Sequence, residues 1–241
     1  MSKKIAVLIT GRGNNTLRNK NILPVNGLPL MSYGAIEAKK LNNISKFYIS
    51  SDDDNILQIG EELGFKRIKR PDYLGAPTSP HGDAVKHALE VMKIRDGFVC
   101  DILIIVMANC ATIECHQIQD CLALLSEDES ISTVAPVIKN NDHHPFRAKR
   151  IDLDGFVQTF IPLSGNKIAS NRQQLEPNYF LCHSFYVLRV NKCFSENGQP
   201  PWNFMGNKIK PYVVKYSLDV HSQEDIWLTE KWLNKKKDEK C

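Results

Sequence analysis

The chain has 241 residues, enough for one large α/β domain that buries an adequate core without disulfides. Its 31 lysines and arginines and 27 aspartates and glutamates give a net charge of +4, too mild and too scattered for a nucleic-acid-binding protein. The first apolar run is too short for a signal peptide or a membrane span, and the seven cysteines form no CxxC pair, so we predict a cytoplasmic protein with reduced thiols and no membrane partner.

Apolar runs alternate with segments of helical period along most of the chain. The runs that predict strands are 5–10, 46–50, 66–69, 102–108, 131–138, 181–188 and 208–216. The segments that predict helices are 30–41, 54–64, 82–93 and 114–126, followed by an amphipathic helix at the end of the chain. This order predicts an α/β protein with a Rossmann-like, mostly parallel sheet flanked by helices, in which 102–108 is a central strand because it is apolar throughout.

Residues 140–180 break the alternation, since they are polar and loop-rich. An Asp-Gly turn between two short alternating runs predicts a hairpin within 149–160. Apolar residues in this segment, Phe156, Phe160 and Ile161, are expected to be exposed and therefore to meet a partner subunit. We predict a core made of 1–139 and 181–241, with 140–180 inserted as a dimerisation arm, and a homodimer.

The turn after the first predicted strand combines glycines, cations and asparagines. In an open parallel sheet, ligands bind beyond the carboxyl ends of the strands, and such a turn offers backbone N–H groups and fixed positive charge to a polyphosphate. Its candidate phosphate-binding residues are Gly11, Arg12, Gly13, Arg18, Lys20 and Asn21. The spacing matches neither GxGxxG nor a P-loop, so a well-capped basic surface turn is the alternative. The preferred interpretation is a nucleotide-handling enzyme.

Two acidic segments are candidate metal sites. The aspartates at 52–54 precede a predicted helix, and we prefer to interpret them as its N-terminal cap. Asp219 and His221 alternate on a predicted strand, which places both on one face as a Mg²⁺ site needs. The pattern SxxD at 222–225 is explained by a helix cap without any metal.

The arm concentrates polar donors. Arg147 and Arg172 could bind an acidic substrate bidentately, and hydrogen bonding between subunits is the alternative. His143 and His144 are adjacent, so they lack the spacing of a zinc motif. The arm is therefore predicted to contact either an acidic substrate or a second subunit.

The motifs occur in the order of a known family. Along essentially the whole chain run ITGR…NKN, GLPLM, YISSDDDNI, RPDYL, HALE, DHHPFRAKRI, NRQQL and LDVHSQED. This order resembles the acylneuraminate cytidylyltransferases, or CMP-sialic acid synthetases. The resemblance implies a nucleotidyltransferase domain with a dimerisation arm. It also implies a reaction in which the anomeric hydroxyl of an acidic keto-sugar attacks the α-phosphorus of CTP and releases pyrophosphate with the help of Mg²⁺.

The resemblance also implies a role for each matching residue. Lys20 and Asn21 match the pair that holds triphosphate and ribose, and Arg70 matches an arginine near the cytosine. The predicted catalytic residues are Arg12, Arg18 and Lys20. The predicted nucleotide-binding residues are Gly11, Arg12, Gly13, Asn14, Lys20, Asn21, Arg70 and Asn109. The predicted acceptor-binding residues are Arg147, Arg172, Gln173 and His183, and the predicted metal ligands are Asp219 and His221.

Four departures from the family pattern concern catalysis and the acceptor. The opening loop is one residue shorter and lacks the lysine that acts on the α-phosphate, for which Arg18 is the candidate substitute. His221 stands in place of a second metal aspartate and is a poorer ligand for Mg²⁺. Segments 107–111 and 182–184 replace the residues that line the sugar site, which predicts an acceptor other than ordinary sialic acid. The alternatives are a phosphonate or phosphorylated small acid as acceptor, and a nucleotide-binding homologue without activity.

Overall fold

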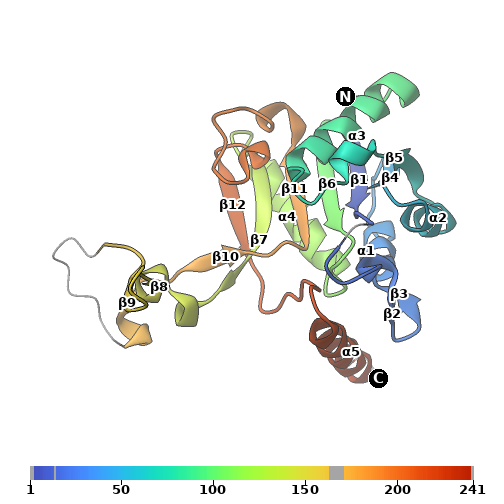
Figure 1. Ribbon diagram of the computed structural model, residues 1–241. Coiled ribbons are helices and arrows are strands. Elements are labelled where there is room, and N and C mark those ends of the chain that lie inside the picture. Colours follow the sequence, from blue (N-terminus) through green and yellow to red (C-terminus); the bar gives the residue numbers. More distant parts are fainter. Residues whose placement is uncertain (1–2, 14, 163–170, 240–241) are drawn as a thin grey trace.

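The computed structural model describes residues 3–13, 15–162 and 171–239 and shows a mixed α/β fold (Figure 1). The strands of the central sheet are β1 (Ile5–Thr10), β4 (Lys46–Ser51), β5 (Lys66–Lys69), β6 (Ile102–Met107), β7 (Thr133–Lys139), β10 (Tyr179–Leu181), β11 (Phe185–Arg189) and β12 (Ile209–Val213). Their order is β10-β7-β11-β6-β1-β4-β5, and β12 pairs with β7. The pairings of β1 with β4 and β6, of β4 with β5 and of β7 with β12 are parallel, whereas β10 and β11 run antiparallel to their neighbours.

The predicted helices are confirmed, with ends shifted by a few residues. They are α1 (Leu30–Lys39), α2 (Asp54–Glu62), α3 (His81–Asp96), α4 (Cys115–Glu127) and α5 (Gln223–Asp238). Asp53 caps α2, since its carboxylate accepts from the N–H groups of Asn55 at 2.8 Å and Ile56 at 3.3 Å. Ser222 opens α5 through a capping box with Asp225. Both caps agree with the interpretation drawn from the sequence.

The alternation of side chains along the strands divides the core into two halves. Val7 and Ile9 point to one face of the sheet, where they pack with α1, α2 and α4. Ala6 and Leu8 point to the other face, where they pack with α3. The central position predicted for 102–108 is confirmed, because β6 lies between β11 and β1 with its first five residues buried. Helices on both faces leave the carboxyl edge of the parallel strands open for a site.

The single strand predicted at 181–188 is instead two strands. The N–H of Cys182 donates to the carbonyl of Pro136 at 2.9 Å. β10 and β11 pair with the same edge of β7, because β12 pairs with Val134 and Val137 from the opposite edge. Residues Cys182–Ser184 interrupt the strand before it continues as β11 between β6 and β7. Periodicity could not locate this interruption, because both halves of the segment remain apolar.

The strand predicted at 208–216 is confirmed only as β12, and Asp219 and His221 do not lie on a strand. They lie in an irregular connection between β12 and α5. The N–H of Val220 donates to the carbonyl of Asn109 at 3.0 Å, so this part of the connection is fastened to the loop after β6. The connection is thereby drawn to the carboxyl edge of the sheet.

Residues between β7 and β10 form an arm that projects from the sheet (Figure 1). It contains the predicted hairpin, made of β8 (Lys149–Ile151) and β9 (Val157–Thr159). Phe156 is 68% exposed and Phe160 is 62% exposed, as expected, whereas Ile161 is partly buried. A small sheet of β2 (Pro24–Val25) and β3 (Leu28–Pro29) lies before α1.

The six described cysteines are free thiols, four of them buried. Within the described ranges, none of the helices combines the length and the apolar character that crossing a bilayer requires.

Candidate functional site

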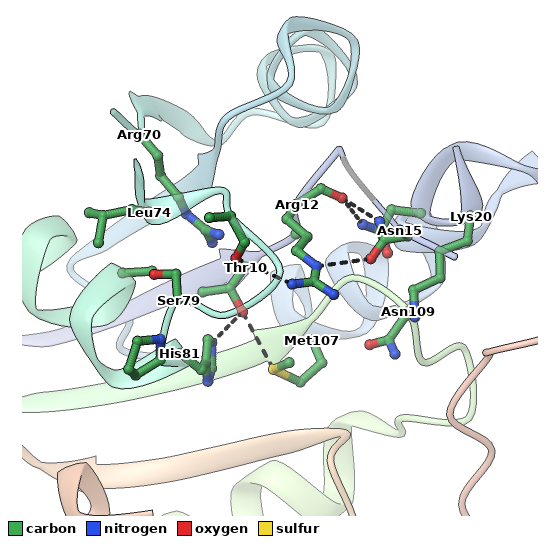
Figure 2. A pocket seen from close by; sticks show the side chains of 15 residues that line it. Thr10, Arg12, Asn15, Lys20, Arg70, Leu74, Ser79, His81, Met107 and Asn109 are labelled. Atoms are coloured by element: carbon green, nitrogen blue, oxygen red, sulfur yellow. Dashed lines mark hydrogen bonds between the residues drawn. The ribbon is translucent and has the colours of Figure 1, made fainter. Parts of the chain in front are cut away.

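A cavity of about 210 Å³ lies at the carboxyl edge of β1 and β6 (Figure 2). It is lined by Thr10, Gly11, Arg12, Asn15, Lys20, Asn21, Arg70, Leu74, Ala76, Ser79, Pro80, His81, Ala84, Met107 and Asn109. Six of the predicted site residues, namely Gly11, Arg12, Lys20, Asn21, Arg70 and Asn109, are therefore brought together from three separate segments of the chain. This is the edge where the topology of an open parallel sheet places ligands.

Arg12 bridges two loops across the mouth of this cavity. Its guanidinium donates to the carbonyl oxygens of Pro77 at 3.1 Å and Ala76 at 3.5 Å, and to Asn15 Oδ1 at 3.3 Å. The amides of Asn15 and Asn21 both donate to the Arg12 carbonyl, at 2.6 and 2.9 Å. The guanidinium is thus held by contacts to neutral oxygens, which an anion could replace. The backbone of Arg12 is fixed separately, by the two asparagine amides.

Arg70 enters the cavity from β5, and most of its side chain is buried. Its Nε donates to Ser50 Oγ and its Nη2 to the Ser50 carbonyl, both at 2.8 Å, while Figure 2 shows the guanidinium directed toward the cavity. Burial lowers the pKa of Arg70 to about 10, opposed by Asp52, so the group remains charged at neutral pH. A buried, oriented guanidinium reads planar acceptors such as the edge of a base.

Lys20 places a buried ammonium group at the opposite end of the cavity from Arg70. Its Nζ donates to the carbonyl of Val220 at 2.9 Å. Burial lowers the pKa of Lys20, while the negative charge of Asp219 acts in the other direction. Beside it, Gly11 passes so close to the end of β6 that a Cβ there would lie 2.9 Å from the Cβ of Ala108. Only glycine fits this approach without a shift of the backbone.

His81 and Thr10 close the floor of the cavity. His81 Nε2 lies 3.0 Å from Thr10 Oγ1, and the Thr10 hydroxyl donates to Met107 Sδ at 3.4 Å. Burial lowers the pKa of His81 to about 3, so the imidazole is neutral. The sequence analysis did not select His81, Thr10 or Asn15. One sequence signal could have indicated His81, because this residue begins a helix directly after a turn, at the edge where ligands bind.

The Asp219 and His221 pair lies next to the cavity. Asn109 Nδ2 donates to Asp219 Oδ1, and His221 Nε2 lies 3.0 Å from Asp219 Oδ2. Burial raises the pKa of Asp219, opposed mainly by His221. Among the described residues, no three or more His, Cys, Asp or Glu side chains gather as a metal cluster. Asp219 is paired with His221 beside the site.

The other predicted site residues lie elsewhere. The N–H of Gly13 donates to Asp52 Oδ1 at 3.1 Å, and Arg18 is exposed outside the lining. Arg147 and Gln173 are exposed on the arm. Arg172 is described by its backbone alone, in a turn at Arg172–Gln174. Asn14 lies outside the described residues.

His183 lies in the interruption between β10 and β11. Its Nδ1 is hydrogen-bonded to the hydroxyl of Tyr186, and its ring lies 5.0 Å from that of Trp202, centroid to centroid. Burial lowers the pKa of His183, while Asp219 acts to raise it. The interaction with Asp219 indicates that His183 lies toward the Asp219 end of the site.

Comparisons with known proteins give a distant sequence match and a shared fold. No model of a protein family matches the sequence. Over 97 residues, the chain is 28% identical to the N-acylneuraminate cytidylyltransferase of Escherichia coli O18:K1:H7 (strain RS218 / NMEC). That match covers 40% of this chain and 23% of the relative, so the chain spans under a quarter of the curated relative's length. The resemblance inferred from the motifs is thus confirmed as a distant one.

Solved structures show the fold over almost the whole chain. CMP:2-keto-3-deoxy-manno-octonic acid synthetase complexed with CTP aligns with a TM-score of 0.67 at 14% identity, covering 97% of this chain and 100% of the other. The 4-diphosphocytidyl-2C-methyl-D-erythritol synthase from Anaerococcus prevotii DSM 20548 aligns with a TM-score of 0.65 at 14% identity, covering 96% and 99%. The fold is therefore the one found in nucleotidyltransferases.

Proposed function

We propose that this chain is a cytidylyltransferase that transfers CMP from CTP to a small acidic, sugar-like acceptor and releases pyrophosphate. The observation that carries the proposal is the convergence of Arg12, Lys20 and Arg70 on one cavity at the carboxyl edge of the sheet. The sequence similarity to a cytidylyltransferase supports the choice of nucleotide.

The two ends of the cavity suit the two ends of CTP. Arg70 donates to the acceptor atoms of the cytosine edge, in a part of the cavity that Leu74 and Ala84 make apolar. Arg12 and Lys20 hold the triphosphate with the backbone at Gly11, and Asn21 keeps the Arg12 backbone in place. Arg18, at the surface, binds the outer phosphates.

The chemistry needs positioning and charge neutralisation. A hydroxyl oxygen of the acceptor forms a bond to the α-phosphorus, the bond from that phosphorus to the bridging oxygen breaks, and the hydroxyl proton is lost to solvent. Negative charge grows on the pyrophosphate that leaves, and Arg12 and Lys20 stabilise it. Because Lys20 is already buried, little reorganisation is needed as that charge develops.

The residues beside the cavity fit a divalent cation that has one protein carboxylate. Mg²⁺ is commonly held by one or two carboxylates together with phosphates of the substrate, and Asp219 provides one. We propose Asp219 and His221 as the ligands, and the imidazole makes transition ions such as Mn²⁺ competent as well. When bound, the cation supplies positive charge to the phosphates.

The arm is proposed to join two copies. Its exposed Phe156 and Phe160 need a covering surface, and Arg147, Arg172 and Gln173 lie on an element that projects from the chain's own sheet (Figure 1). A homodimer brings these donors to the acid group of an acceptor at the other copy's site. His183 contacts the acceptor from within the chain.

Nucleotide binding and pyrophosphate release test the proposal. CTP should raise the thermal midpoint more than ATP, GTP or UTP at equal concentration, because Arg70 is fixed for one base edge. Pyrophosphate should then be released from CTP with at least one acid of a panel of nonulosonic acids. Equal thermal shifts for the four nucleotides would contradict the assignment of the base.

Two other outcomes would identify alternative functions. Pyrophosphate release with phosphonates or phosphorylated acids alone identifies those as the acceptors. Tight CTP binding with no release at any divalent metal identifies a nucleotide-binding protein without turnover. The pairing of Asp219 with His221, in place of a second aspartate, is the observation that favours this last candidate.

A further inference from the structure

A groove of about 980 Å³ lies between the start of α4, the end of β12 and α5. In Figure 1, α5 follows β12 through the irregular connection that carries Asp219. Within the described chain, the groove has no lining residue in common with the nucleotide cavity. Neither the motifs nor the proposed reaction account for it.

The floor of the groove is apolar and partly exposed. The rings of Tyr216 and Trp232 are stacked, with their centroids 6.3 Å apart and their planes at 7°. Val213 is 59% exposed, Tyr216 is 42% exposed and Leu228 is 37% exposed. α5 packs on the core through another side, where Ile226 is buried. The groove side of α5 is therefore a second apolar face, and an apolar face open to solvent is typical of a contact site.

The walls of the groove are held in place by contacts between its elements. Lys236 of α5 pairs with Glu114, directly before α4, at 3.1 Å between Nζ and Oε1. The hydroxyl of Tyr212 in β12 donates to Asp120 of α4 at 2.8 Å. The start of α4 is thus tied to α5 and its middle to β12. The groove is formed before a partner binds, so binding needs little ordering of the chain.

The groove carries an excess of positive charge. Four lysines and two glutamates line it. One glutamate is paired with Lys236, and the other, Glu239, lies 3.9 Å from Lys235. In the described parts of the chain, neither Lys215 nor Lys231 has a carboxylate partner, and both side chains are exposed. Two ammonium groups beside the apolar floor therefore remain available to carboxylates of a partner.

The edge of β12 disfavours a partner that adds a strand to the sheet. Among the described strands, β12 pairs with β7 alone, so its other edge is open. The N–H of Val214 donates to the carbonyl of Val137 in β7 at 2.9 Å, so the backbone of Pro211, an odd number of residues away, faces the open edge. Proline has no N–H to offer there, which leaves an added strand incompletely paired. The partner is therefore expected to bind through side chains in the groove.

The charge of the groove also disfavours a second copy of this chain. An isologous contact places the same residues of two copies opposite each other, so Lys215 and Lys231 would meet like charges. A partner rich in carboxylates gains an ion pair with each of them instead. A flat bilayer surface would meet the rim of the groove but not its apolar floor.

We propose that this groove docks an acidic segment of another protein. An aromatic or aliphatic side chain of that segment rests on Tyr216 and Trp232, while its carboxylates pair with Lys215 and Lys231. The inference goes beyond the proposed function and does not depend on it, because the groove is separate from the nucleotide cavity.

Selection from a phage-displayed library of random peptides on the full chain tests the proposal. The enriched peptides should carry net negative charge together with at least one aromatic or aliphatic residue. In fluorescence polarisation, a selected peptide should bind the double variant Lys215→Glu/Lys231→Glu about tenfold or more weakly than the wild type, because two ion pairs become two repulsions. Lys93→Glu, which reverses an exposed lysine of α3, is the matched control and should bind within about twofold of the wild type.

A second variant and an NMR measurement locate the bound peptide. Leu228→Ser removes apolar surface without changing charge and should weaken binding by about threefold or more. The indole N–H resonance of Trp232 should shift when the peptide is added, whereas that of Trp202, which lines another cavity, should not move. Thermal unfolding of each variant shows that it is folded.

Three results would overturn the proposal. The first is a library that yields no enrichment, or enriched peptides without negative charge, or peptides that bind the double variant as well as the wild type. The second is a wild-type oligomer that the double variant dissociates in light scattering, which identifies a second copy as the occupant. The third is sedimentation with vesicles of phosphatidylcholine and phosphatidylserine that the double variant loses, without peptide binding, which identifies a membrane surface.

Discussion

Replacing Arg12 by alanine tests the triphosphate site most directly. The guanidinium lies at the mouth of the cavity, where its partners are the carbonyls of Pro77 and Ala76 and the amide oxygen of Asn15. All three are neutral acceptors. A phosphate that replaces them would give the guanidinium a partner of opposite charge. We expect Arg12→Ala to weaken CTP binding without unfolding the protein.

The magnitude follows from the exchange of partners. A unit charge about 4 Å from a phosphate oxygen contributes roughly 4 kcal/mol at an effective dielectric constant of about 20. The bonds to the two carbonyls, at about 0.5–1.5 kcal/mol each, are given up when the anion binds. About 2 kcal/mol remains, so the Kd for CTP should rise about 30-fold.

Isothermal titration calorimetry at low and high salt measures this change. Arg12→Lys should fall between the wild type and alanine, because it keeps the charge but loses the planar fork. Raising the salt to about 0.5 M should shrink the difference, since the group is only partly buried. Arg67→Ala, which removes a partly exposed arginine paired with Asp54, is the matched control. A Kd for Arg12→Ala within about twofold of the wild type would refute the phosphate assignment.

Three further predictions concern stability and assembly. Because burial lowers the folded-state pKa of His81 from 6.5 to about 3, the unfolded chain binds the proton first as the pH falls, and the free energy of unfolding should drop by up to about 1.4 kcal/mol per pH unit below pH 6.5. In urea titrations at three pH values, His81→Gln should reduce that slope, and an unchanged slope would contradict the neutral imidazole. Asp53→Ala should lower the free energy of unfolding by about 1 kcal/mol, because two N–H groups of α2 lose their acceptor, whereas Asp54→Ala at the neighbouring position should have a smaller effect. Replacing Phe156 and Phe160 together by serine should shift the protein from dimer to monomer in light scattering, and a wild type that is itself monomeric would remove the basis for the arm's proposed role.

Local chemistry predicted the elements well where one residue type decides the backbone. The asparagines, glycines and cations after β1 indicated a ligand-binding turn, and Asp53 and Ser222 indicated helix starts that the structure confirms. The uninterrupted apolar run of β6 was enough to place it in the centre of the sheet. These signals depend on residues that are close in sequence, so they can be recognised without knowledge of the fold.

Where the neighbour is distant in sequence, the prediction was wrong or absent. The interruption at Cys182–Ser184 lies where the strand that pairs with β7 also takes β6 as a neighbour, and the course of Asp219 depends on a bond between Val220 and Asn109. A cavity beside α3 is lined on its other side by a segment more than a hundred residues later, around Trp202. No local pattern records such pairings, because they arise when elements pack.

The sequence by itself determined the order of strands and helices, the caps, and the cationic turn, since hydrophobic period and turn chemistry act over a few residues. Only the tertiary structure decided that Arg12, Lys20 and Arg70 enclose one space, and that Arg18 lies outside it. The reason is physical: a strand's direction and neighbours are fixed by burial across the whole sheet, and the carboxyl edge exists only once those strands have paired.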